Sequence, residues 1–252
     1  MTMTHPSPEK LAAEFWNGTG LHETFPRKIE QAIAFKLPVA LVGLSPLNVA
    51  AIGHWLRQRD IATQLPTDRR DLCGCLVAHG GRGFIFICDT DAPEEQRLTL
   101  AHETAHFLVD YLWPRQQVLH ALGEGMAEVL DGLRLATPAE RAAAILSRLH
   151  LGPHIHVLPR PGRDEDADVA VAHAEDCADR FALELVAPRA CVRDVLDGLA
   201  ARQPLTPEAA RTALATHFGL PAYAFRDAIQ RIFRRQPTSF IADIAAGLRR
   251  RR

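Results

Sequence analysis

The sequence contains no apolar run long enough to cross a membrane. Its longest such run, residues 37–44, is short and includes a proline, whereas a membrane-spanning helix needs about 20 predominantly apolar residues. The first ten residues, MTMTHPSPEK, also lack the basic stretch followed by an apolar segment that marks a secretory signal. We therefore expect a cytoplasmic protein with no membrane partner.

Cysteine is scarce, and neither sign of charge predominates. Five cysteines among 252 residues are too few, and odd in number, for a disulfide framework, so we expect reduced thiols. The 29 basic and 30 acidic residues give a formal net charge of −1, which excludes a polybasic nucleic-acid binder and an acidic disordered chain. Apolar residues make up 47% of the chain, enough for a sizeable core in a soluble protein.

Strand patterns are confined to a small part of the chain. A compact apolar strand is predicted at 38–44, and strands at 72–78 and 83–88 are joined as a hairpin by His79-Gly-Gly-Arg82. A loop rich in Pro, Gly and charge is predicted at 152–168. Helices are predicted at 9–16, 27–35, 45–59, 93–112, 116–134, 137–150, 167–186, 190–201, 207–218, 222–235 and 237–252. This pattern predicts an α+β, helix-dominated fold with a small β-sheet.

Several of these boundaries rest on capping and proline signals. Ser45-Pro46 is predicted to open a helix, and Pro114 to end one. Thr137 and Glu140 form a predicted capping box. Thr206 and the glycine at 219 are predicted to cap and stop a helix.

The pentapeptide at 102–106, His-Glu-Thr-Ala-His, carries the clearest chemistry in the sequence. On a helix, His102 and His106 lie one turn apart on the same face, so both imidazoles can bind one metal ion. Glu103 lies about 100° further around the helix, where it can reach a metal-activated water. The spacing therefore predicts a metallohydrolase site. The alternative is a pair of histidines at the core edge that pair with carboxylates, although burying them without a metal would be costly.

A catalytic zinc site needs a third protein ligand, and the downstream sequence offers several. They are Glu124, Glu128, Asp131, His154, His156, His173, Glu175 and Asp176. His154 and His156 fall in the predicted 152–168 loop, and we interpret them as exposed loop residues in preference to a second metal site. His173 and Asp176 lie off the apolar stripe of their predicted helix and are weaker candidates.

Glu175 is the favoured third ligand. It continues, at i−3, the apolar stripe of Ala178, Phe181, Ala182 and Leu185, so it faces the core, where a lone carboxylate would be costly. The alternative is a half-exposed glutamate near a helix start that is favoured by the helix dipole.

Two motifs in this order resemble those of the ImmA/IrrE-type metallopeptidases. The run RLTLAHETAHFLV (97–109) is similar to the first signature of that family, and EDCADRFALELVAP (175–188) is similar to the second. The resemblance covers about residues 70–236 and implies a zincin-like fold with Glu175 as the third zinc ligand. It departs from the family pattern at Thr104-Ala105, where Leu-Gly is usual, and at Asp179, where Asn is usual. The separation of 69 positions from His106 to Glu175 is also longer than expected, which indicates an insertion at about 114–168.

The resemblance implies a zinc-dependent endopeptidase, with manganese as an alternative metal. His102, His106 and Glu175 would hold the metal, and Glu103 would activate the water that hydrolyses the peptide bond. The implied substrate is a helix-turn-helix transcriptional repressor, whose cleavage derepresses genes, for example in stress responses. The residue that completes the oxyanion hole stays open among Tyr111, Tyr223 and several histidines. The competing hypothesis is a non-catalytic binding or regulatory module that retains the zincin shape.

The domain prediction follows from the same motifs. Residues 1–188 are predicted to form the metallopeptidase domain with an N-terminal βα extension, and residues 1–65 lack the N-terminal helix-turn-helix of some relatives. Residues 189–236 resemble the helix-turn-helix-like module that follows the family core, with a plain helical hairpin as the alternative. Residues 237–252 form a basic tail. The eight arginines between 225 and 252 make nucleic-acid contact conceivable, but a solvated tail is favoured.

Overall fold

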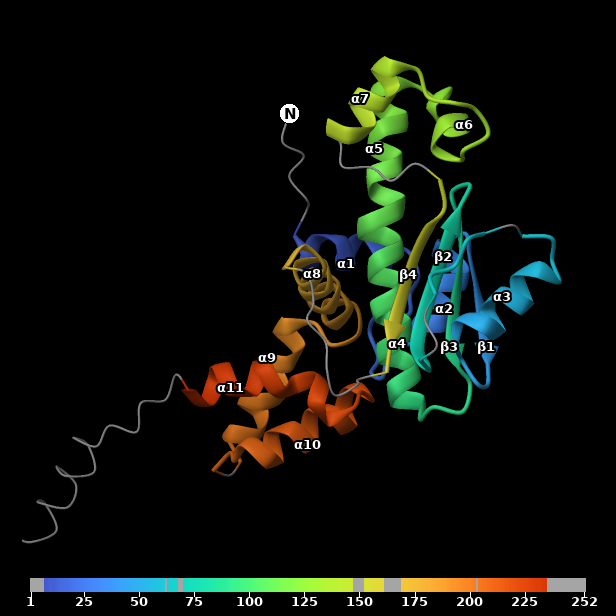
Figure 1. Cartoon of the computed structure of the whole chain (residues 1–252). Coiled ribbons are helices and arrows are strands. Elements are labelled where there is room, and N and C mark those ends of the chain that lie inside the picture. The colour runs from blue at the N-terminus through green and yellow to red at the C-terminus, as the bar shows by residue number, and fades with distance from the viewer. Residues whose placement is uncertain are drawn as a thin grey trace, which may run out of the picture.

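The computed structural model describes residues 7–61, 63–67, 70–146, 152–160, 169–202 and 204–234. It confirms an α+β fold that is mainly helical, with one small sheet (Figure 1). The first helices are α1 (Pro8–Trp16) and α2 (Ile29–Lys36). Among the described residues, none of the helices combines the length and apolar character needed to span a bilayer.

The sheet has four strands in the order β1-β3-β2-β4. They are β1 (Val39–Leu44), β2 (Leu72–His79), β3 (Arg82–Cys88) and β4 (His154–Pro159). β1 is parallel to β3, and the other two pairings are antiparallel. The predicted hairpin is confirmed: β2 and β3 are joined by two glycines with φ of 61° and 75°, the left-handed conformation that a tight hairpin turn requires.

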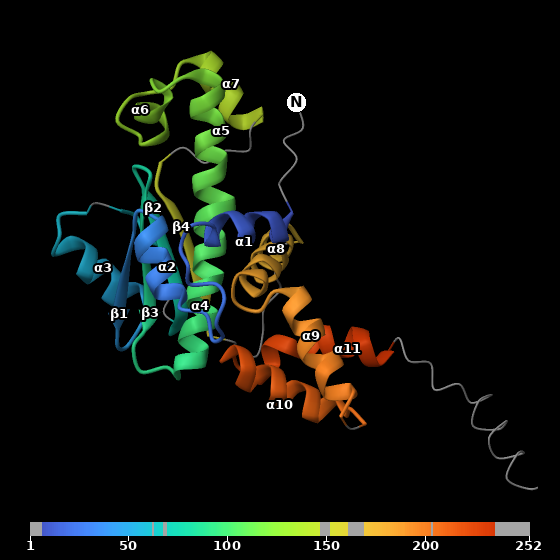
Figure 2. The ribbon, with the colours of Figure 1, turned by 180° about the vertical axis from the view of Figure 1, so that it is seen from behind.

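Helices cover both faces of the sheet. The two sides of β2 alternate, as a strand requires: Leu76 and Ala78 belong to the larger core, whereas Cys75 and Val77 face the smaller core beneath α3 (Val49–Arg57). The larger core is formed with α1, α2, α4 (Pro93–His106) and α8 (Val169–Val186). Figure 2 shows α1 beside α8, where the Trp16 Nε1 donates a 2.9 Å hydrogen bond to the Leu185 carbonyl.

The helix that carries the pentapeptide does not end at Pro114, contrary to the prediction. α4 continues through a π-helical segment, η1 (Phe107–Leu112), into α5 (Trp113–Leu122), and Figure 1 shows one long rod. The Trp113 amide donates to the Leu108 carbonyl, five residues back. This change of register places Pro114 in the first turn of α5, where the missing amide hydrogen of proline is tolerated.

The prediction that Ser45-Pro46 opens a helix is also wrong. α3 starts at Val49, and its N-cap is Asn48, whose side chain accepts a 2.9 Å hydrogen bond from the Ala51 amide. The Leu47 carbonyl accepts from the Leu72 amide at 2.8 Å, and Asn48 forms a bridge to Asp71. These contacts hold the chain extended until Asn48, so the helix begins three residues late.

The predicted loop at 152–168 contains strand β4 within its described part. Ile155 and Val157 pack against the smaller core on one face of the sheet, and the side chains between them point to the other face. β4 therefore pairs with the edge of β2 that the hairpin leaves open. Residues 161–168 lie outside the described residues.

Within its described residues, the predicted insertion at about 114–168 contains most of α5 and two further short helices. The predicted helix at 116–134 is interrupted at Gly123, where φ is 91°, and α6 (Met126–Leu130) follows. The capping box that opens α7 (Pro138–Leu146) is confirmed. The Thr137 amide donates to Glu140 Oε2 at 2.8 Å, and the Glu140 amide donates to Thr137 Oγ1 at 3.3 Å.

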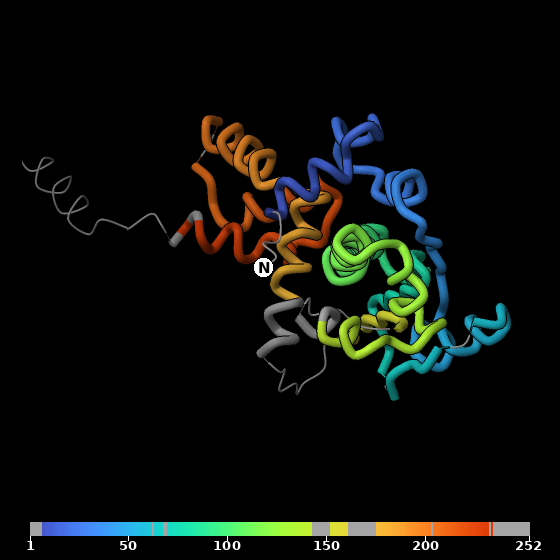
Figure 3. Tube along the Cα trace, turned by 90° about the horizontal axis from the view of Figure 1, so that it is seen from above, coloured from blue at the N-terminus to red at the C-terminus, as the bar shows by residue number. Residues whose placement is uncertain are grey.

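The C-terminal helices pack onto the same core as the rest of the described chain. They are α9 (Arg189–Ala200), α10 (Pro207–Phe218), the 3-10 helix η2 (Ala222–Phe225) and α11 (Arg226–Arg234). Leu214, Phe218 and Phe225 belong to the larger core, although Figure 3 shows these helices set to one side of the sheet. Thr206 and Gly219 cap α10 as predicted. The predicted tail at 237–252 lies outside the described residues.

Candidate metal centre

The two histidines of the pentapeptide face the same point from adjacent turns of α4. His102 and His106 are both almost completely buried, and their Nε2 atoms lie 3.1 Å apart. Thr104 and Ala105, which lie between the two histidines, are fully buried. Small side chains at these two positions suit a helix that is packed on more than one side.

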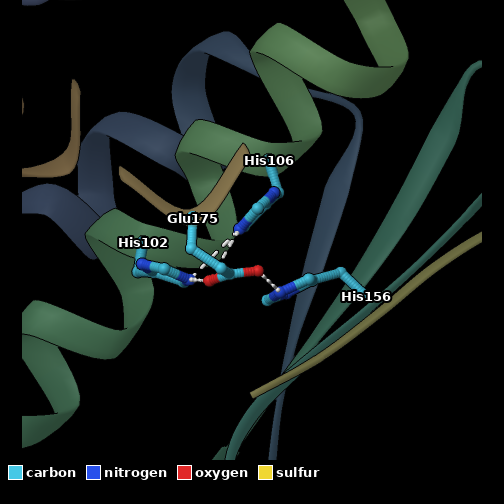
Figure 4. Close-up of side chains that lie close together, drawn as sticks. All are labelled: His102, His106, His156 and Glu175. Atoms are coloured by element: carbon cyan, nitrogen blue, oxygen red, sulfur yellow. Dashed lines mark hydrogen bonds and ion pairs between the residues drawn. The ribbon is translucent and has the colours of Figure 1, made fainter. Parts of the chain in front are cut away.

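Glu175 reaches the same point from α8. Its Oε2 lies 3.2 Å from His102 Nε2 and 3.7 Å from His106 Nε2. Ala178, Phe181, Ala182 and Leu185 are all buried, so the apolar stripe turns toward α4 as the sequence predicts. Figure 4 shows the carboxylate of Glu175 lying between the imidazoles.

The spacing of these atoms suits a tetrahedral divalent ion. Two ligand atoms that are each about 2.0–2.1 Å from a tetrahedral zinc ion lie about 3.3 Å from each other. The three separations among His102, His106 and Glu175, from 3.1 to 3.7 Å, bracket that value. The donor set of imidazole and carboxylate suits zinc and also admits manganese.

His156, which the sequence analysis assigned to an exposed loop, also reaches this point. It extends from β4, its side chain is 13% exposed, and its Nε2 lies 2.9 Å from Glu175 Oε1. Its ring stacks on that of His106 with centroids 3.7 Å apart. His102, His106, His156 and Glu175 together form a group that could hold a metal ion, with one donor atom of each within 4.8 Å of the others.

The sequence did contain a signal for His156. In His154-Ile-His-Val157, polar and apolar residues alternate, as they do in a strand with one face on the core. The neighbouring prolines and glycine pointed to a loop instead. The alternation places His154 and His156 on the face of the sheet toward α4, opposite Ile155 and Val157.

Each of the three imidazoles is held at its other nitrogen by a carboxylate. His102 Nδ1 lies 2.9 Å from Asp179, and His106 Nδ1 lies 2.6 Å from Asp110. His156 Nδ1 lies 3.0 Å from Glu103 Oε2. A carboxylate accepts the proton of Nδ1 and so leaves Nε2 free to bind a metal. Asp179 thus orients His102.

Glu103 is enclosed between α4 and β2. It has no exposed surface, and among the described residues no hydrogen-bond donor reaches its Oε1. A Cβ atom at Gly74 would lie 2.7 Å from this Oε1 and 2.6 Å from Thr99 Cγ2. Position 74 therefore has to be glycine for the Glu103 carboxylate to fit. A buried carboxylate oxygen without a donor is costly, which is expected of a group that is kept for chemistry.

The electrostatics of the cluster favour bound positive charge. Burial opposes protonation of His102, but hydrogen bonds to Asp179 and Glu175 outweigh it and raise its pKa to about 9. Burial likewise opposes protonation of His156, but Glu103 and Glu175 raise its pKa to about 10. Burial alone would raise the pKa of Glu175, yet its three histidine partners hold it well below the usual range.

The other predicted ligands whose side chains the structure describes do not belong to this cluster. Asp131 pairs with Arg115 at 2.6 Å, Glu128 lies 3.7 Å from Arg134, and Asp176 pairs with Arg180 on the exposed side of α8. Glu124 is exposed. His154 stacks on Tyr111 at 6.2 Å, and the side chain of His173 lies outside the described residues.

The two tyrosines considered for the oxyanion hole have other contacts. The Tyr111 hydroxyl accepts a 2.7 Å hydrogen bond from the Gly81 amide in the hairpin turn. Tyr223, in η2, donates to Glu95 Oε2 in the first turns of α4. Burial and the adjacent Glu95 both raise the pKa of Tyr223, so its hydroxyl stays protonated.

Comparisons of the chain with protein-family models, with curated proteins and with solved structures find no match. The assignment of the site therefore rests on its own residues and their geometry.

Proposed function

We propose that the protein is a metal-dependent peptidase whose centre is formed by His102, His106 and Glu175. One observation carries this proposal. The Nε2 atoms of the pentapeptide histidines and a carboxylate oxygen from a distant helix lie 3.1–3.7 Å apart, with a fully buried glutamate beside them. The sequence resemblance to ImmA/IrrE-type metallopeptidases supports the same function.

The roles of the residues follow from their positions. A bound zinc ion supplies Lewis acidity toward the substrate carbonyl and toward water. Asp179 and Asp110 hold the two pentapeptide imidazoles in the tautomer that presents Nε2. Glu103 takes the proton of the attacking water at a carboxylate oxygen and passes it to the leaving amine. The burial of Glu103 keeps bulk water away from its carboxylate, which strengthens the electrostatic interaction between the carboxylate and the proton that it takes.

The proposed substrate is a protein, in the first place a helix-turn-helix transcriptional repressor. This part of the proposal rests on the two resembling motifs. α10, η2 and α11 form a helical unit beside the catalytic helix, joined to it by the hydrogen bonds from Arg97 to the Gly219 carbonyl and from Tyr223 to Glu95. In this proposal, the unit contributes to substrate contact near the start of α4.

A second candidate function is a binding or regulatory module with a purely structural metal. The contact between His156 Nδ1 and Glu103 Oε2, at 3.0 Å, favours it, because it gives Glu103 a structural partner. In that case the protein would act through its surface, and the metal would only stabilise the fold.

The test combines metal content with cleavage. The zinc-loaded full chain is incubated with the helix-turn-helix repressor encoded nearest to it, and the fragments are analysed by mass spectrometry. Glu103→Gln should retain about one metal per chain and lose about 10²–10⁴-fold in cleavage rate, since a general base is removed. Glu94→Gln, an exposed position of the same helix, is the control and should cleave normally. If Glu103→Gln still binds the repressor and regulates it as the wild type does, the result would favour the binding module with a structural metal.

A further inference from the structure

The three histidines of the cluster have the same arrangement of partners. Each directs Nε2 toward the cluster, with contacts of 3.2, 3.7 and 2.9 Å to the Glu175 carboxylate from His102, His106 and His156 respectively. Each has its Nδ1 against a different carboxylate, at 2.6–3.0 Å. Histidines that bind a metal show this pattern, because the outer carboxylate fixes the tautomer that frees the inner nitrogen.

His156 therefore directs its Nε2 toward the same carboxylate as the two pentapeptide histidines, although it contacts Oε1 whereas they contact Oε2. It is as well oriented as they are, although it comes from a strand and lies outside any recognised motif. Four protein ligands complete the tetrahedral shell of a zinc ion, whereas a catalytic site keeps one position for water or substrate.

We infer that His156 is a fourth metal ligand in the resting protein and that the site is closed until β4 moves. This inference rests on the proposed metal centre. In the closed state, Glu103 orients His156 through Nδ1. Withdrawal of His156 opens one coordination position, and the same movement releases Glu103 Oε2 from its only hydrogen-bond partner among the described residues. One displacement thus supplies both the open position and the free base that hydrolysis needs.

The position of β4 suits such a displacement. Within the described part of the sheet it pairs with β2 alone, and all six of its residues are only half-buried. Its pairing with β2 already contains a register irregularity between Leu72 and Gly74, beside the Glu103 carboxylate. The energetic cost of moving a half-buried edge strand is lower than that of moving α4 or α8, whose inner faces are in the core.

A direct test counts the histidines on the metal in the wild-type chain. The full-length protein, labelled with ¹⁵N-histidine and loaded with ¹¹³Cd, is examined by NMR for coupling between the metal and ring nitrogens. Three coupled Nε2 atoms are expected. Two coupled nitrogens would overturn the inference and leave the proposed peptidase centre intact. Failure to bind cadmium, zinc or cobalt would remove the metal centre itself, and the inference with it.

A second test asks whether a coordination position opens. Cobalt replaces the metal, and its visible absorption is recorded with and without thiocyanate. The wild-type spectrum should not respond to the anion, whereas that of His156→Ala should. His154→Ala, two residues away on the same strand, should behave like the wild type. A wild-type spectrum that responds as strongly as that of His156→Ala would mean that the position is already open, which contradicts the inference.

Discussion

At the scale of single residues, the candidate site shows which side chains a sequence can place and which it cannot. His102 and His106 are brought together by the geometry of one helix, so their spacing alone was sufficient. The partners that orient them differ in this respect. Asp110 lies one turn after His106 and could be inferred locally, whereas Asp179 comes from another helix and meets His102 only in the folded chain.

Asp179 gives a prediction at this scale. Asp179→Ala removes the group that orients His102 and should weaken zinc binding about 10–100-fold. Asp179→Asn should recover most of the affinity, because the amide oxygen can accept the same hydrogen bond. Isothermal titration with zinc measures both variants, with Asp176→Ala, an exposed neighbour on α8, as the control. Equal affinity in the alanine variant and the wild type would show that His102 is oriented in another way.

At the scale of elements, the sequence predicted those whose signals are local. The capping box of α7, the two-glycine hairpin and both ends of α10 were found because the residues that make the contacts lie within a few positions of each other. Two predicted helix boundaries were wrong because non-local structure decides them. The π-helical segment before Pro114 lets the helix continue past that proline. The hydrogen bond from the Leu72 amide to the Leu47 carbonyl keeps the chain extended after Ser45-Pro46. β4 was missed because the prolines and glycine beside it indicated a loop, and because its partner, β2, lies about 80 residues earlier in the sequence.

Two glycines, Gly219 at the C-cap of α10 and Gly198 inside α9, should respond in opposite ways to substitution by alanine. Gly219 ends α10 with φ of 59°, and a Cβ atom there would lie 2.6 Å from both Pro26 and Arg97. Gly219→Ala should therefore lower the free energy of unfolding by about 1–3 kcal/mol. Gly198 lies inside α9 with no atom within 4 Å of its added Cβ, so Gly198→Ala should raise it by about 0.5–1 kcal/mol.

Urea unfolding of the wild type and both variants measures these changes. Similar destabilisation by the two substitutions would contradict the view that α10 is docked against α4 and the Phe25-Pro26 segment through its C-terminal end.

At the scale of the whole molecule, the cluster joins three segments that are distant in the sequence. α4, β4 and α8 each contribute to it, and a bound ion would link them across the larger core. The sequence predicted two of these three segments. It identified the helices through the pentapeptide and the apolar stripe of α8, but the short alternation that marks β4 was outweighed by the neighbouring prolines and glycine.

The stability of the whole chain should respond to pH in opposite ways with and without metal. In the metal-free chain, the pKa values of His102 and His156 are raised to about 9 and 10 from an ordinary value near 6.5. Their contribution is therefore fully present below pH 6.5 and is lost as pH rises toward 9–10. In the zinc-loaded chain, stability should instead fall as pH drops, since protons compete with the metal for the same nitrogens.

Urea unfolding at several pH values, with excess chelator or with zinc, measures the two slopes. Parallel pH dependence under both conditions would mean that zinc does not bind these histidines.

The most direct measurement is anomalous X-ray scattering at the zinc edge from crystals of the zinc-loaded protein. We predict a single strong peak in contact with the Nε2 atoms of His102 and His106 and the carboxylate of Glu175, at about 2.0–2.2 Å from each ligand atom. A peak at another location, or no peak among these side chains, would contradict the metal centre on which the proposed function depends.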